Sequence, residues 1–326
     1  MKANVSRSTR ARHRPSTPRD ASPVGYRIGH DSPVRALLFD TAPILWLLRV
    51  VWVTMPFTLG SALSGALADQ TSPTKIVVGL LAWAIWAGAL GASLVLRPIT
   101  LTAVRVLVPI SVPAAIWALW PDGQWGATTL ISLAAALIAT YAALAASSGN
   151  AFVDGASYGD EQRMTLRVPG PLTPIVVAVW AAIVTTALGG PILLAARWWV
   201  LGSLALVLGP PVGFIGLRAL HSLARRWVVF VPAGMVLHDH LSLVTPVLFS
   251  RQTIATMSPA VEPGTAVDFT QGAFGLAVGV QLHEEVSATL ADGRGKSHQA
   301  DITAFIFAPT RPGAVLAHAQ QKRLLG

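Results

Sequence analysis

The sequence predicts a membrane all-α bundle of about six transmembrane helices, followed by a small antiparallel β domain that ends in a helix. Three observations support this fold class. First, 53% of the 326 residues are hydrophobic and only 12% are charged, whereas soluble domains carry about 25% charged residues. Second, the middle of the chain holds six apolar stretches, each near the ~20 residues that a helix needs to cross a membrane. Third, the hydrophobic period changes after Arg225 to that of short strands.

The charged residues are distributed unevenly and divide the chain into three parts. Residues 1–40 carry eight Lys/Arg and three Asp/Glu, residues 41–221 carry eight and five, and residues 222–326 carry eight and seven. We therefore expect a disordered basic cytoplasmic tail over 1–40, a six-helix transmembrane domain over 41–221 and a β-rich cytoplasmic domain over 222–326. Adhesion to anionic lipid is the expected use of the tail. Specific nucleic-acid binding is not expected, because no aromatic or folded motif accompanies the basic residues.

Six apolar stretches are the predicted transmembrane helices. They lie at Ala42–Leu67, Ile76–Leu96, Ile99–Trp120, Ala127–Ala146, Leu172–Ala195 and Trp198–Leu220. Gly189–Pro191 could end the fifth stretch early, and Pro210 and Pro211 are expected to break or kink the sixth, because proline cannot donate a backbone hydrogen bond. Prolines also predict an irregular third helix. Small residues four apart, such as Gly209 and Gly213, predict close helix packing.

Basic and aromatic residues predict the orientation of these helices. With a cytoplasmic N-terminus, the cytoplasmic side receives the basic tail together with Arg97, Arg163, Arg167, Arg218, Arg225 and Arg226. The opposite side receives only Lys75 and Arg197. The outer interface then holds Trp117, Trp120, Trp125, Trp198 and Trp199. The sequence thus predicts a multi-pass protein of the plasma membrane with both termini cytoplasmic and no secretory signal.

The predicted spans contain few ionisable residues. All 15 carboxylates and all eight histidines lie outside them, which argues against a proton-coupled carrier, a pump or an intramembrane metalloenzyme. Arg49 is expected to extend to the lipid headgroups. Arg105 either does the same or faces a polar interior near Ser111 or Thr140, where it could meet an anionic lipid group.

The cytoplasmic loop between the fourth and fifth spans, residues 147–171, is the first candidate functional region. Polar and apolar residues alternate over 164–168, which predicts a strand with one buried face whose natural partner is the C-terminal domain. The candidate ligand- or partner-binding residues are Arg105, Tyr158, Asp160, Glu161, Arg163 and Arg167. The alternative interpretation of the loop is a hydrated connector with a local ion pair.

Short apolar runs separated by turn residues predict the strands of the C-terminal domain. We expect strands at Trp227–Val231, Met235–Leu237, Leu243–Phe249, Gln252–Met257, Ala266–Phe269, Phe274–Gln281, Val286–Leu290 and Ile302–Ala308. Pro232–Gly234 is expected to form the first turn. Thr310 is expected to cap a last helix, with Arg311 and Pro312 in its first turn.

The segment Arg226–His238, followed by Pro246–Ile254, resembles the opening strands of the bacterial pleckstrin-homology-like (PH-like) domain. The order of short strands and one terminal helix after membrane spans is similar to that family, and the resemblance covers only the C-terminal domain. Family members that bind phosphate use several Lys/Arg in the first strand loops. Only Arg225, Arg226 and Arg251 occur in the equivalent stretch, so the resemblance does not imply lipid-headgroup binding.

Motifs of catalysis and metal binding are sparse. The chain has no cysteine, and it lacks the hydrolase elbow, the P-loop, the dinucleotide-binding fingerprint and the zinc-protease motif. His238–His240 could chelate a metal ion with His283–Glu285, although turn residues after a strand explain them equally well. We expect no cofactor, no metal and no enzymatic activity.

The leading hypothesis is a non-enzymatic scaffold or accessory subunit that recruits or regulates a partner at the cytoplasmic face of the membrane. Its expected partners are the lipid bilayer and either a protein or a second copy of the chain. A transporter or lipid-handling protein that uses Arg105 is the alternative. An enzyme acting on a lipid through Tyr158–Arg163 is the third hypothesis.

Overall fold

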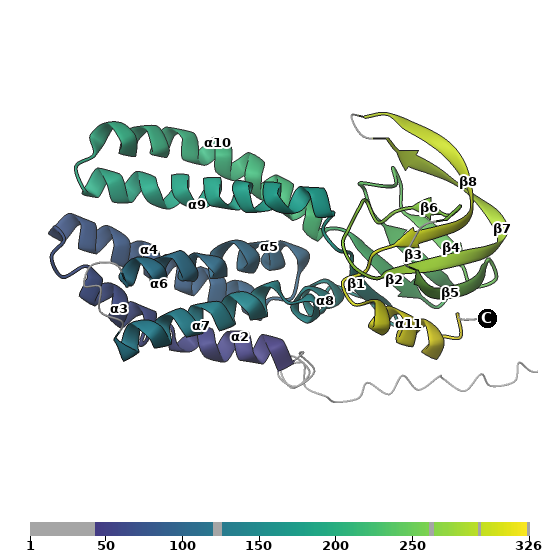
Figure 1. Ribbon diagram of the computed structural model, residues 1–326, viewed down its shortest axis with the longest axis horizontal. Coiled ribbons are helices and arrows are strands. Elements are labelled where there is room, and N and C mark those ends of the chain that lie inside the picture. The colour runs from purple at the N-terminus through teal and green to yellow at the C-terminus, as the bar shows by residue number, and fades with distance from the viewer. Residues whose placement is uncertain (1–42, 120–125, 261–263, 293–294, 325–326) are drawn as a thin grey trace, which may run out of the picture. The chain divides into compact units, whose positions relative to one another are not determined.

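The computed structural model describes residues 43–119, 126–260, 264–292 and 295–324 (Figure 1). They belong to one compact unit, Thr41–Gly326. The predictions for the basic tail over 1–40, and for Trp120 and Trp125, fall outside the described residues.

The first two thirds of this unit is helical. Its elements are α2 (Pro43–Thr54), α3 (Leu59–Ala66), α4 (Ser72–Leu94), α5 (Pro98–Leu107), η1 (Val108–Ile110), α6 (Ser111–Ala118), α7 (Ala127–Leu144), α8 (Ala146–Asp154), η2 (Gly170–Leu172), α9 (Thr173–Ala195) and α10 (Trp199–Ala224). Within the described ranges, six helical segments are long and apolar enough to cross a membrane. They are Pro43–Ala66, Ser72–Leu94, Pro98–Ala118, Ala127–Leu144, Gly170–Ala195 and Trp199–Ala224. The six predicted stretches therefore form the six long helical segments.

The interruptions of these helical segments agree with the prediction only in part. The third segment is irregular as predicted, because η1 separates α5 from α6 around Pro109. The first segment is also interrupted, between α2 and α3, where Pro56 lies in a turn. The fifth stretch does not end early, because α9 continues through Pro191 to Ala195, and α10 continues through Pro210 and Pro211 without a break. Gly190 helps to explain this continuity, since its missing side chain lets α9 pack directly on the backbone of Leu206 in α10.

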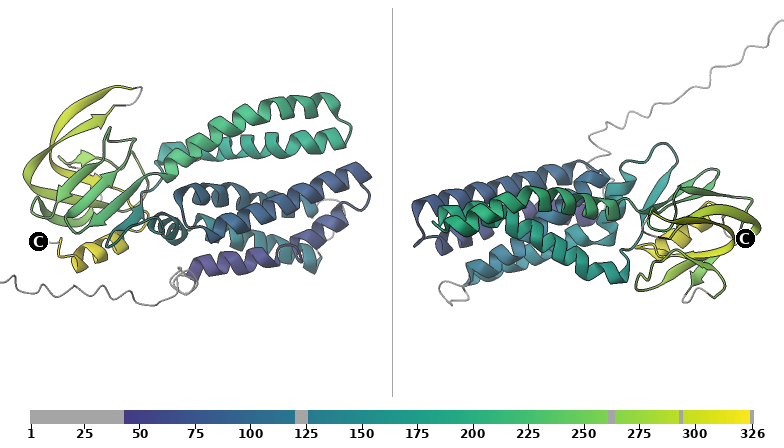
Figure 2. Two further views of the ribbon diagram at one scale, coloured as in Figure 1. Left: turned by 180° about the vertical axis from the view of Figure 1, so that it is seen from behind. Right: turned by 90° about the horizontal axis from the view of Figure 1, so that it is seen from above.

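Helices α9 and α10 form an antiparallel pair beside the other helices (Figures 1 and 2). Trp180 of α9 donates its indole N–H to the carbonyl of Val106 at 3.0 Å. The tighter η1 turn leaves carbonyls one turn earlier without their usual helical donors, and the indole satisfies one of them. The Thr102 hydroxyl and His221 Nδ1 lie 3.0 Å apart nearer the β domain. His221 thus lies inside α10, which continues beyond the predicted end of the sixth span.

Small and aromatic side chains hold the other helices together. Ala136, Ala139 and Ala142 of α7 are fully buried, so neighbouring helices approach this helix closely. Trp52 of α2 and Trp86 of α4 each donate an indole N–H to the other's carbonyl, both at 2.9 Å. Large apolar side chains cover the outer surface of the helices instead, an arrangement that suits a lipid environment better than water.

The last third forms two four-stranded sheets and a helix (Figure 1). Its elements are β2 (Trp227–Val231), β3 (Gly234–His238), β4 (Val247–Ser250), β5 (Ile254–Ala260), β6 (Val267–Asp268), β7 (Ala277–Ala291), β8 (Ser297–Phe307) and α11 (Pro312–Gln321). The strand orders are β1-β2-β3-β4 and β5-β7-β8-β6, and β1 (Gln162–Thr165) comes from the loop between the helices. The pairing is antiparallel as predicted, except that β6 runs parallel to β8.

A shared core lies between the two sheets and α11. Phe249 from the first sheet stacks on Phe305 from the second, with ring centroids 4.4 Å apart, and Val315 of α11 is fully buried in the same cluster. Gly234 forms the predicted first turn at φ +153°, where an added Cβ would collide with the carbonyl oxygen of Phe249. Glycine is therefore required at this turn.

Several predicted boundaries in this domain are wrong: the strand expected at Leu243–Phe249 spans only Val247–Ser250, and the one expected at Ile302–Ala308 begins at Ser297. The expected strands Phe274–Gln281 and Val286–Leu290 are one strand, β7, because a bulge between them lets the strand bend while it stays paired with β8. Arg311, and not Thr310, precedes the first turn of α11. The Thr310 hydroxyl takes part in a network with other segments instead.

Candidate functional site at the junction of the helices and the β domain

The loop between the fourth and fifth long segments supplies a strand to the β domain. β1 pairs with β2, with Gln162 opposite Phe230 and Thr165 opposite Trp227. A strand in this loop that pairs with the C-terminal domain is thus confirmed, although it spans Gln162–Thr165 and not residues 164–168. Met164 is buried as expected, whereas Val168 lies beyond the strand and is exposed. The loop also contains α8, which the sequence pattern did not predict, because its nine residues carry no sustained apolar period.

A polar network joins α8, β1 and the segment before α11. The side-chain oxygen of Asn150 accepts hydrogen bonds from the Thr165 amide at 2.9 Å, the Thr165 hydroxyl at 2.7 Å and the Thr310 hydroxyl at 3.3 Å. The Thr310 amide donates to the Thr165 carbonyl at 2.9 Å. One amide side chain therefore links three segments that are distant in sequence, and the network fixes β1 against α8.

A buried ion pair joins the end of α10 to the turn after β3. Arg226 donates from Nε to Asp239 Oδ1 at 2.7 Å and from Nη2 to Oδ2 at 2.8 Å. It also donates from Nη1 to the Arg167 carbonyl at 2.8 Å. Asp239 in turn accepts from the Ser242 hydroxyl at 2.9 Å. Arg226 thus fastens the entry to α9 and the exit from α10 to the β domain.

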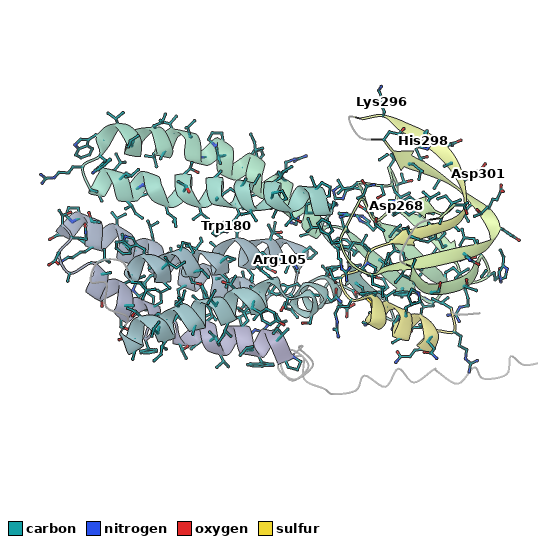
Figure 3. All side chains as sticks on the ribbon, viewed as in Figure 1. Arg105, Trp180, Asp268, Lys296, His298 and Asp301 are labelled. Carbon is teal, nitrogen blue, oxygen red and sulfur yellow. The ribbon has the colours of Figure 1, made fainter. Side chains whose placement is uncertain are left out.

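Arg105 lies on α5 against α8 (Figure 3). Its Nη2 is 2.7 Å from the position that a Cβ of Gly149 would occupy, so the guanidinium group rests where α8 has no side chain. Its Nε is buried and has no hydrogen-bond partner in the part of the chain that the structure describes. The expected neighbours are not its partners, because Ser111 donates to a backbone carbonyl and the Thr140 hydroxyl is unpaired among the same residues.

Arg49 does not extend to the surface, contrary to the prediction. Only 7% of it is exposed, and its Nη2 donates to the Ser93 carbonyl at 2.7 Å. Ser93 lies at the C-terminal end of α4, where backbone carbonyls have no donor within the helix. Arg49 donates to this carbonyl inside the bundle and therefore does not need to reach the headgroups.

The polar loop residues are not gathered into one site. Tyr158 is 88% exposed and Asp160 is also exposed. Glu161 and Arg163 form an ion pair at 3.2 Å with both side chains partly exposed. The Arg163 guanidinium carbon lies 6.0 Å from the centre of the Trp227 ring, so the Arg163 side chain reaches strand β2.

Arg167 holds a loop of the β domain at the start of α9. Its Nη1 donates to the carbonyl of Phe274 at 2.7 Å and to that of Leu276 at 3.3 Å. The Phe274 ring lies over Gly170, where an added Cβ would be 2.6 Å from it, yet the side chain is 78% exposed. A large aromatic residue is thus presented to the surroundings beside the first turn of a long apolar helix.

A pocket of about 270 Å³ opens at the same junction. Its lining residues are Arg97, Pro98, Ile99, Ala156, His221, Arg225 and Trp227. The Trp227 ring stacks on His238 at 4.9 Å and an interplanar angle of 17°. The sequence pattern did not predict this pocket, although Arg97 and Arg225 lie beside predicted span ends and this placement was the available signal.

No metal centre emerges from the residues suggested for one. Within the ranges described, no three His, Asp or Glu side chains are grouped closely enough to hold a metal ion. Asp239 is engaged by Arg226, and His238 lies against Trp227. His238 and Asp239 therefore have structural partners.

Taken together, the elements define a helical protein whose six long apolar segments are joined to a β domain built from two separate parts of the chain. Comparisons with protein-family models, with curated proteins and with solved structures find no match to this chain.

Proposed function

We propose that this chain is a multi-pass plasma-membrane protein that acts as a non-enzymatic scaffold or accessory subunit. Its PH-like β domain recruits or regulates a protein partner at the cytoplasmic face. The observation that carries this proposal is the sharing of β1 and Arg226 between the helices and the β domain. A domain on a flexible linker samples many orientations, whereas a domain that shares a strand with the helices presents one surface at a set place.

The separation of charge supports the membrane orientation. Arg97, Arg225 and Arg226 lie at the helix ends that join the β domain, whereas Arg197 lies in the turn between α9 and α10. Trp198 and Trp199 beside that turn are 60% and 64% exposed, as expected of tryptophans at a membrane interface. The positive-inside rule then assigns the β domain to the cytoplasm.

Orientation can be tested directly because the chain has no cysteine. Single substitutions Lys75→Cys and Arg197→Cys are expected to react with a membrane-impermeant maleimide in intact cells. Tyr158→Cys and Lys296→Cys are expected to react only after lysis. All four positions are exposed, so the reverse pattern would contradict the proposed orientation, and equal labelling of all four would contradict insertion.

Strand β4 is the proposed docking edge. It lies at the end of its sheet, with β3 on one side and no paired strand on the other among the described residues. Leu248 on this strand is 49% exposed. An edge strand offers backbone hydrogen-bonding groups to an extended segment, and its side chains select the sequence that binds. The proposed occupant is an extended apolar segment of a protein partner.

Cross-linking in native membranes tests recruitment. The wild-type chain is expected to retain one partner in stoichiometric amount, and Leu248→Glu is expected to lose it. Gln252→Glu is the matched control, because this exposed residue follows β4 and adds the same charge. Absence of a stoichiometric partner, or equal recovery by all three chains, would argue against the scaffold. Recovery of a second copy would make the partner a homo-oligomer.

Transport or lipid handling is the second candidate function, and Arg105 favours it. Its Nε is buried and has no hydrogen-bond partner in the described structure. A cation without a partner within a helix bundle is a natural binding site for an anionic group. Arg105→Leu and Arg105→Lys should both abolish lipid or solute movement in reconstituted vesicles. Unchanged movement in these variants would exclude this role.

A further inference from the structure

We propose that the pocket between α5, α10 and β2 binds an anionic phosphate group, and that the headgroup of a membrane phospholipid supplies it. Three elements converge there. Arg97 and Ile99 come from the beginning of α5, His221 from the last turn of α10, and Arg225 and Trp227 from the passage into β2. The site therefore exists only where the helices meet the β domain.

The basic residues of this pocket have no protein counter-charge. In the described parts of the chain, neither Arg97 nor Arg225 has a carboxylate within ion-pair distance, and neither guanidinium group donates a hydrogen bond to another residue. Both residues are exposed. Arg226, the next residue, shows the contrast, since it is buried and paired with Asp239. Both guanidinium groups are therefore free to bind phosphate oxygens at the edge of the pocket.

The histidine of the pocket is held in place. The Thr102 hydroxyl lies 3.0 Å from His221 Nδ1 and also donates to the Pro98 carbonyl at 3.1 Å. This chain of contacts links the first turn of α5 to the last turn of α10. His221 is thus held in a fixed position in the pocket wall.

The other side of the pocket is apolar and favours lipid over free phosphate. Ile99 is 59% exposed, and Pro98 and Trp227 complete that side. Trp227 is stacked on His238, so its face is held in one orientation. A free phosphate ion gains nothing from such a wall, whereas the glycerol and the first acyl carbons of a phospholipid can cover it.

This inference rests on the proposed insertion in a membrane but not on partner recruitment. Its failure is therefore distinguishable, because cysteine labelling reports insertion without reference to lipid binding. A chain that inserts as proposed and does not retain anionic lipid would refute only the present inference.

Native mass spectrometry of the full-length protein in detergent with added phosphatidylglycerol or phosphatidylcholine tests the proposal. The wild-type chain is expected to retain one phosphatidylglycerol in preference to phosphatidylcholine. Arg97→Gln combined with Arg225→Gln should weaken this binding at least about tenfold, because two charge-assisted contacts are lost. Equal retention of the two lipids, or unchanged binding by the double variant, would overturn the proposal.

Three further arms make the result specific. Arg197→Gln removes one positive charge at the α9–α10 turn and should leave lipid binding unchanged. If it weakens binding as much as the double variant does, the attraction is general and the proposed site is overturned. Arg97→Lys with Arg225→Lys keeps the charge and should restore part of the binding, whereas a folding defect would not be rescued. Displacement of the lipid by millimolar inorganic phosphate would assign the pocket to a soluble ligand and overturn the lipid assignment.

Discussion

Arg226 and Asp239 form a two-pronged ion pair, with hydrogen bonds of 2.7 and 2.8 Å, in which the side chains are only 2% and 0% exposed. The arginine follows directly on the exit from α10, and the aspartate follows β3. Removing one member of a buried pair leaves an uncompensated charge, which is far more costly than the loss of an exposed pair.

Arg226→Leu and Asp239→Leu are each expected to destabilise the β domain by about 3–5 kcal/mol. The double variant should lose much less than the sum, because it buries no unpaired charge. Denaturant unfolding followed by the fluorescence of a tryptophan such as Trp227 measures both effects, and strictly additive losses would contradict the coupling.

Asn150 is expected to hold β1 in place. Asn150→Leu removes the acceptor of three hydrogen bonds and should cost roughly 1–3 kcal/mol for the donors left unsatisfied. Faster amide hydrogen exchange over Gln162–Thr165 is the expected readout. Thr310→Val is the milder comparison, because it leaves the Asn150–Thr165 contacts intact. Equal exchange in the two variants would show that Asn150 does not carry the network.

The packing of α9 on α10 depends on two glycines of α10, Gly202 and Gly216. An added Cβ at Gly216 would lie 2.7 Å from the Ile183 side chain, and one at Gly202 would meet Leu194 at 2.8 Å. Gly216→Leu should therefore destabilise the pair by roughly 1–3 kcal/mol through overpacking. Gly213→Leu is the matched control, since nothing lies within 4 Å of its Cβ position. Thermal unfolding in detergent measures the difference, and equal midpoints would contradict this contact face.

The docking of α11 should weaken at acidic pH. Burial lowers the pKa of His318, and the charge of Lys322 lowers it further, while Asp154 raises it in part. Because the folded pKa is below the unfolded one, the unfolded chain binds more protons as the pH falls below about 6.5, and folding stability decreases there. His318→Gln should remove part of this pH dependence between about pH 7 and 5. An identical dependence in the variant would contradict the prediction.

The helices were the most predictable part of this fold, because crossing a membrane requires a length and an apolarity that the sequence states directly. The strands of the C-terminal domain were also found, as at Trp227–Val231, because their apolar runs are short and bounded by turn residues. The continuity of α10 through Pro210 and Pro211 was not predicted, since it depends on packing against α9 and not on local propensity.

The candidate site was predictable only in part. The strand in the loop between the fourth and fifth helical segments, and the presence of Arg105 within an apolar stretch, were visible in the sequence. The Asn150 network and the pocket at Arg97 and Arg225 were not, because each brings together segments more than a hundred residues apart. No periodicity or short motif encodes such a meeting, and only the folded chain reveals it.

The origin of β1 has a consequence for biosynthesis. Its residues leave the ribosome before α9 and α10 are made, whereas its partner strand follows α10 directly. The nascent strand must therefore wait, with an unpaired edge, until two more long apolar helices have been synthesised. For the same reason, a fragment beginning at residue 222 lacks one strand of its first sheet, and grafting this β domain onto another protein requires both pieces.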